Sequence, residues 1–158
     1  MAIHRLAARV LPVNPRGEVL LLQGQDPARP GDLHWVSIGG AVDEGETHEQ
    51  AAIRELLEET GIVVDPAALV GPIGGGVHPF SWDGVDYVSH STFFAIPLDA
   101  DADVDVHFGG LEEAEVGNIL QARWWRPEDL RTDGSAASED MPDIMATAID
   151  AVLTEGRA

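Results

Sequence analysis

The sequence of 158 residues contains no cysteine and no lysine, and it has no long uninterrupted apolar run. The absence of cysteine excludes disulfides, thiolate metal ligands and cysteine nucleophiles. A membrane-spanning helix needs about 18 or more apolar residues, and no segment supplies them. The first residues, Met1 to Arg5, lack the apolar block and small-residue cleavage site of a signal peptide. We therefore expect a cytoplasmic protein with no membrane partner.

Basic charge is also scarce, because nine arginines face 28 acidic residues and the formal net charge is −19. A chain this acidic repels nucleic-acid backbones and anionic membranes, so we expect no nucleic-acid partner. Solubility alone can account for such a charge. If the substrate is anionic, however, a local positive charge must offset the field, and a bound divalent cation would do so.

The length predicts one domain, residues 1–158, with a core that needs no covalent staples. Apolar and turn patterns predict two helices, at 47–60 and 140–153, and a helix or loop at 111–121. They also predict a turn at 126–130 and strands at 5–13, 18–23, 34–38, 62–64, 69–77, 85–98 and 122–125, the first two forming a hairpin. This order of elements predicts an α/β or α+β fold with a mixed sheet.

The helix at 47–60 has the clearest end signals. Thr47 and Gln50 have the spacing of a capping box, and Gly61 stands where a helix-ending glycine belongs. Apolar spacing predicts a core face made of Ile53, Leu56, Leu57 and Thr60.

Three glutamates on this helix, Glu55, Glu58 and Glu59, fall within an arc of about 100°. They repel one another and lie near the C-terminal end of the helix, where the macrodipole disfavours anions. Arg54 is the only arginine between Arg29 and Arg123. Converging oxygens with so little basic compensation suit a hard cation such as Mg²⁺. The alternative is a solvated acidic helix face.

The surrounding spacing favours the cation. Residues Gly40 to Ile62 fit the pattern G-x5-E-x7-R-E-U-x-E-E-x-G-U, where U is apolar, at every defined position. For this composition a chance match is on the order of one in a million. The stretch resembles the Nudix box, with Ile38 where many relatives carry proline. The resemblance implies an α/β/α sandwich with a mixed central sheet and an Mg²⁺-dependent hydrolase, in which Mn²⁺ can substitute.

The resemblance also implies roles for residues of the motif. Glu58 and Glu59 would be the main metal ligands, and Glu55 a further ligand or the base that activates water. Arg54 would hold Glu55 through an ion pair, and Glu46 would support the metal shell. A backbone carbonyl of Gly39 or Gly40 would complete the set, because glycine permits close approach of the main chain.

Candidate site residues outside the motif are supported by weaker sequence signals. Glu115 is the expected distal acid, acting as base or extra ligand, with Glu112 and Glu113 as alternatives and a solvated loop acid as the plain explanation. Arg9 could contact a substrate phosphate, with a strand arginine that extends its head group to solvent as the equal alternative. Trp35 and Tyr87 could stack on a base or ribose, although core packing is the more frequent role of aromatic residues. Residues 24–32 and 75–87 are expected to select the substrate.

The expected activity is hydrolysis of the pyrophosphate bond in a nucleoside diphosphate joined to another group. ADP-ribose, a nucleotide sugar or a dinucleotide is favoured, because the net charge of −19 repels a triphosphate more strongly. The alternative substrate is a nucleoside or deoxynucleoside triphosphate. From other classes, a catalytically silent nucleotide-binding regulatory module and an acidic structural protein are the rivals. Members of the family are often dimers, so a homodimer is also an expectation.

Overall fold

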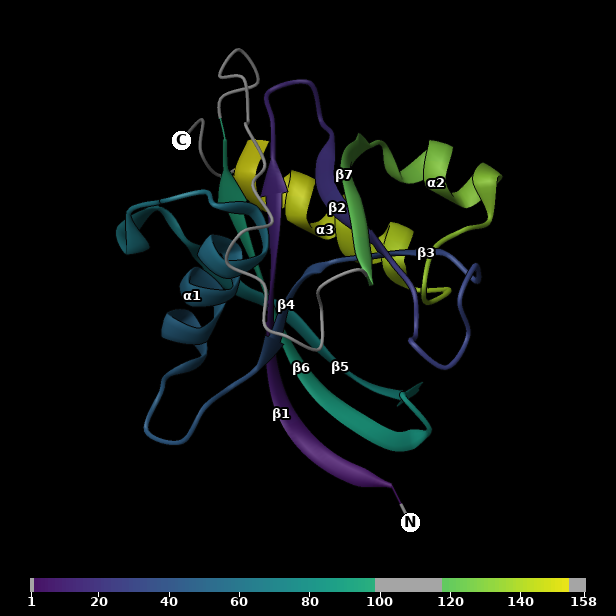
Figure 1. Ribbon diagram of the computed structural model, residues 1–158. Coiled ribbons are helices and arrows are strands. Elements are labelled where there is room, and N and C mark those ends of the chain that lie inside the picture. Colours follow the sequence, from purple (N-terminus) through teal and green to yellow (C-terminus); the bar gives the residue numbers. More distant parts are fainter. Residues whose placement is uncertain (1, 99–117, 154–158) are drawn as a thin grey trace.

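The computed structural model describes residues 2–98 and 118–153, which form a curled mixed sheet with helices on both faces (Figure 1). The helices are α1 (His48–Thr60), α2 (Pro127–Asp133) and α3 (Met141–Leu153), with a 3₁₀ turn at Pro66–Ala68. The strands are β1 (Ile3–Val13), β2 (Val19–Gly24), β3 (His34–Val36), β4 (Ile38–Ala41), β5 (Val70–Trp82), β6 (Val85–Pro97) and β7 (Ile119–Trp125). None of the helices in this part of the chain is long and apolar enough to cross a membrane.

The sheet is mixed, as the sequence predicted. Its strand order is β3-β2-β1-β6-β5, with β4 pairing with β1 and β7 with β2. The pair β1–β6 is parallel and the other pairs are antiparallel. The result is an α+β fold in which β1 lies at the centre and carries β4 along one edge.

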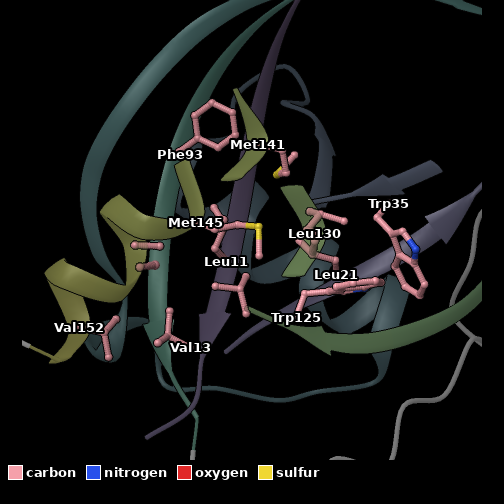
Figure 2. Packing of buried hydrophobic residues seen from close by; sticks show 13 residues of the cluster. Leu11, Val13, Leu21, Trp35, Phe93, Trp125, Leu130, Met141, Met145 and Val152 are labelled. Carbon is pink, nitrogen blue, oxygen red and sulfur yellow. The ribbon is translucent and has the colours of Figure 1, made fainter. Parts of the chain in front are cut away.

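Alternation along the strands divides the core into two layers. Leu11, Leu21, Phe93 and neighbouring side chains pack with α2 and α3 on one face, and Figure 2 shows this cluster around Met145. On the other face, even-numbered residues of β1 pack against α1. Helices therefore cover both faces of the sheet. On β1, odd-numbered residues point to the face covered by α2 and α3, and even-numbered residues point to the face covered by α1.

Helix α1 begins and ends as predicted. Thr47 caps its start in a complete capping box with Gln50, and Gly61 ends it in the left-handed conformation. The predicted core face is wrong at Leu57, whose side chain is 49% exposed. The buried positions of the helix are Ala51, Ala52, Glu55, Leu56, Glu59 and Thr60. The helix therefore turns two of its three clustered glutamates toward the sheet.

Three other boundaries differ from the expectations. The glycine-rich segment after residue 38 was not among the expected strands, but it forms β4 because Ile38–Ala41 pairs with β1. Residues 62–64 lie outside any strand. The expected turn at 126–130 is the start of α2, which has Pro127 at its first position and ends at Gly134. The hairpin of β1 and β2, the strand β6 and the closing helix α3 lie close to where the sequence placed them.

Candidate active site

The candidate site forms where α1 packs on β4. Glu55 and Glu59 are only 5% and 2% exposed, although both are acidic. The backbone N–H of Gly39 donates to Oε1 of Glu59 at 3.0 Å. A burial this deep is costly for a carboxylate without partners, so the position of the two groups is specified by polar contacts.

The two glycines of β4 are required for different reasons. Gly39 has φ +147°, and a Cβ there would lie 2.2 Å from the carbonyl oxygen of Ala8. A Cβ on Gly40 would instead lie 2.6 Å from Oε1 of Glu55. Gly39 therefore permits the strand to pack on β1, and Gly40 leaves room for a carboxylate.

Arg54 links the other acids of the motif. Its Nε and Nη2 donate to the two oxygens of Glu46 at 2.8 and 2.9 Å, a bidentate pair. Its Nη1 donates to Glu55 and to Glu58, both at 3.1 Å, and Nη2 also donates to the carbonyl oxygen of Ala41 at 3.0 Å. One guanidinium thus positions three carboxylates and the end of β4.

These contacts shift the pKa values of Glu46 and Arg54 in opposite directions. The hydrogen bond from Arg54 lowers the pKa of Glu46 to about 2, and the backbone N–H of Asp43 acts in the same direction. The same hydrogen bond to Glu46, followed by the charge of Glu55, raises the pKa of Arg54 further above its usual value. The ion pair is therefore fully charged at neutral pH.

The donor chemistry fits a hard cation. Glu46, Glu55 and Glu58 contact the guanidinium of Arg54, and Glu59, on the same helix as Arg54, accepts from Gly39, so the site carries excess negative charge. Because Gly40 has no side chain, the carboxylate of Glu55 lies close to the main chain of β4. Within residues 2–98 and 118–153, no three acidic or histidine side chains converge closely enough to hold a metal ion. Arg54 holds Glu55 and Glu58 in this arrangement.

The candidates outside the motif occupy different environments. Arg9 is in register with Gly39, and its Nε donates to Oγ of Ser37 at 2.9 Å while Nη2 donates to the carbonyl oxygen of Ser37. Trp35 is 4% exposed and packs edge-on against Trp125, 5.4 Å between ring centres. This burial supports core packing for Trp35 and leaves little ring surface for a ligand.

Tyr87 lies in β6 near the β5–β6 turn, where its ring stacks on Phe80 with the centres 5.1 Å apart. Glu115 and its alternatives Glu112 and Glu113 lie outside the described residues. Sequence reasoning missed the contact of Ser37, because no motif marks this residue and its partner Arg9 lies on β1, 28 residues earlier in the chain. It also missed the burial of Glu55 and Glu59, which depends on partners rather than on hydrophobicity.

Comparison with known proteins assigns the family. The NUDIX domain family model matches residues 3–146, so the chain belongs to the Nudix hydrolase family. It is 47% identical over 73 residues to the oxidized purine nucleoside triphosphate hydrolase of Danio rerio, covering 46% of this chain and 45% of that protein. It is 28% identical over 136 residues to an RNA pyrophosphohydrolase of Wolbachia pipientis, covering 80% of this chain and 77% of the relative.

The match to the Danio rerio protein thus spans less than half of its length. Among solved structures, the MutT protein of Methanosarcina mazei Go1 resembles this fold with a TM-score of 0.65 and 20% identity. That similarity covers 99% of this chain and 98% of the other. The chain is therefore a member of the Nudix family, and its relatives are named for different substrates.

Proposed function

We propose that the enzyme uses Mg²⁺ to hydrolyse the pyrophosphate bond of a nucleoside diphosphate joined to a second group. The observation that carries the proposal is the burial of Glu55 and Glu59 against Gly39 and Gly40, beside the Arg54–Glu46 pair. Burying two carboxylates costs stability. A binding module that only held a nucleotide would gain nothing from this cost.

The residues proposed to hold the metal are Glu55, Glu58 and Glu59, with a backbone carbonyl of Gly39 or Gly40. Mn²⁺ would substitute, because the donors are all oxygen. When bound, the metal supplies positive charge that offsets the pyrophosphate and polarises its oxygens. Glu46 and Arg54 position Glu55 and Glu58 through the hydrogen bonds of 2.8 to 3.1 Å.

A base must also accept a proton from the attacking water. Glu55 is one candidate, because its carboxylate lies beside Gly40 at the buried end of the site. The distal acid Glu115 is the other candidate carried over from the family resemblance. Comparing the pH profiles of kcat for E55Q and E115Q distinguishes them, since the variant that loses its base loses the acidic limb of the profile.

For the substrate, we propose ADP-ribose, a nucleotide sugar or a dinucleotide. The net charge of −19 repels a triphosphate more strongly than a substrate with fewer charges. The alternative is a nucleoside triphosphate, which the name of the Danio rerio relative supports. We also propose that the chain works as one cytoplasmic domain and as a homodimer, which light scattering of the purified protein tests.

The experiment is a hydrolysis screen over ADP-ribose, nucleotide sugars, dinucleoside polyphosphates and nucleoside triphosphates, with Mg²⁺ and with EDTA. E58Q is the test variant and E49Q the matched control, because Glu49 is exposed in the first turn of the same helix. We expect turnover in the wild type and in E49Q, and its loss in E58Q. Tight nucleotide binding without turnover of any substrate would favour the regulatory module instead.

A further inference from the structure

Two histidine side chains meet on neighbouring strands outside the candidate active site. Nδ1 of His4 on β1 lies 2.9 Å from Nε2 of His90 on β6, and the rings stack with their centres 5.2 Å apart at an interplanar angle of 29°. The two residues are 86 positions apart in the chain, so no motif spacing marks them. The pair therefore exists only through the pairing of β1 with β6.

The sheet holds both rings on one face. The strands β1 and β6 pair in parallel with Leu6 opposite His90, so His4 lies diagonally across from His90. Even-numbered residues of both strands face the side covered by α1, as Ala8 and Phe94 do. Figure 1 shows that the first part of β1 and the β5–β6 hairpin extend below the helices. His4 is exposed and His90 is half-buried, so an ion from solvent can reach the pair on a rigid, hydrogen-bonded support.

The side chains directly beside the pair are apolar. His90 lies opposite Leu6 on β1 and opposite Val77 on β5, and these two side chains are 55% and 61% exposed. Arg5 has the opposite parity on β1 and donates to Ser89 on the other face. A cation at the histidine pair is therefore separated from the charge of Arg5 by the sheet. The net charge of −19 attracts cations to the surface of the chain.

The distance between the two nitrogens suits one coordination geometry. At the usual metal–imidazole distance of about 2.0–2.1 Å, ligands at a right angle place their nitrogens about 2.9 Å apart, and ligands at the tetrahedral angle about 3.4 Å apart. The observed 2.9 Å matches the right angle, which is the angle in the square-planar and tetragonal sites of Cu²⁺ and Ni²⁺. The same distance is that of an N–H···N hydrogen bond, so without a metal one proton bridges the two rings.

We propose that His4 and His90 form a binding site for a Cu²⁺ or Ni²⁺ ion, with water at the remaining positions. The ion replaces the bridging proton, and each ring then carries its proton on its other nitrogen. In the described part of the chain no third histidine or acidic side chain joins the pair, so the protein supplies two imidazoles. The site is separate from the glutamates of α1, whose oxygen donors suit Mg²⁺. A bound ion fastens β1 to β6 at the end of the sheet that extends past the helices.

The experiment titrates the untagged protein with Ni²⁺ in excess Mg²⁺, which competes for the glutamates of α1, and measures the dissociation constant by calorimetry. H4Q and H90Q are the test variants. H48Q is the matched control, because it removes one histidine at the start of α1. Loss of an outer-shell partner of a metal costs about 10- to 100-fold in affinity, so loss of a direct ligand should cost at least about tenfold. We expect this loss in H4Q and H90Q, and a change of less than about twofold in H48Q.

Two further measurements separate metal binding from a merely structural role of the pair. Ni²⁺ should raise the melting temperature of the wild type and of H48Q but not of H4Q, each compared with its own metal-free value. The EPR spectrum of bound Cu²⁺ should show coupling to two imidazole nitrogens in the wild type and not in H4Q. Equal Ni²⁺ affinity in H4Q and the wild type, or a Cu²⁺ spectrum with oxygen ligands alone, would overturn the site. His4 is exposed, so H4Q decides the question even if H90Q fails to fold.

Discussion

Replacing Gly40 by alanine should remove activity while leaving the fold largely intact. A Cβ at this position lies 2.6 Å from Oε1, 2.9 Å from Cδ and 3.1 Å from Oε2 of Glu55, so the whole carboxylate is in its way. To restore an ordinary contact of 3.4 Å, the nearest oxygen must retreat by about 0.8 Å. A displacement of about 1 Å in a catalytic group costs about 10²-fold in rate.

The stability cost should be small, because the colliding atoms are the end of a flexible side chain and the φ of Gly40 is not in the left-handed region. Gly39→Ala is the contrasting variant. Its Cβ meets the backbone of β1, at 2.2 Å from Ala8 O and 2.7 Å from Arg9 Cα, and its φ of +147° strains any side chain. We expect about 1 kcal/mol or less of destabilisation in G40A and more than about 3 kcal/mol in G39A.

Urea unfolding measures the free energies, and initial rates with Mg²⁺ measure kcat for both proteins. The expected pattern is a folded, inactive G40A and an unstable G39A. Wild-type kcat in G40A would refute the reasoning, since it would mean that the carboxylate of Glu55 need not lie where the structure has it. A loss of stability in G40A equal to that in G39A would refute the assignment of distinct roles to the two glycines.

Three further predictions follow from the same site. E58Q and E59Q should each lower kcat by about 10²-fold or more, because each removes a negative charge from the cation site, and circular dichroism should stay unchanged. Wild-type rates in both variants would mean that these glutamates only form a solvated helix face. E46Q should lower the unfolding free energy at pH 7 by about 1 to 3 kcal/mol through loss of the charged hydrogen bonds to Arg54. The pKa of Glu46 is lowered from 4.5 to about 2, so its stabilisation is complete above pH 4.5 and is lost as the pH falls toward 2; a wild-type advantage that persists unchanged at pH 2 would contradict the pair. Dialysis against EDTA should abolish turnover, and Mg²⁺ or Mn²⁺ should restore it in a rate assay; full activity in metal-free buffer would exclude the mechanism.

The features that sequence predicted well are local ones. The ends of α1 follow from Thr47, Gln50 and Gly61, which act within one helical turn. The spacing of Arg54 and the glutamates pointed to candidate residues for a similar reason, since all lie on one helix and the loop before it. Motif spacing therefore predicts which residues are candidates for the site, while the burial of Glu55 and Glu59 had to come from the structure.

The errors concern contacts between distant segments. β4 was missed because glycine has low strand propensity and the strand exists through its pairing with β1. Leu57 was assigned to the core because it fits the helical spacing of the apolar residues. The helix buries Glu59 instead, and the N–H of Gly39 is the hydrogen-bond partner of this carboxylate. Hydrophobic periodicity carries no information about such a partner. The contact between the rings of Trp35 on β3 and Trp125 on β7 is likewise a contact between distant segments, which sequence periodicity does not predict.

The most direct test of the central claim is hydrolysis in ¹⁸O-labelled water with Mg²⁺, followed by mass spectrometry of the products. ADP-ribose, diadenosine tetraphosphate and a nucleoside triphosphate are the substrates to compare. Attack by water at phosphorus predicts one labelled phosphate product, no label on the sugar carbon, and loss of the reaction in E58Q but not in E49Q. Label on carbon, or unaltered turnover in E58Q, would contradict a pyrophosphohydrolase that works through the clustered glutamates of α1.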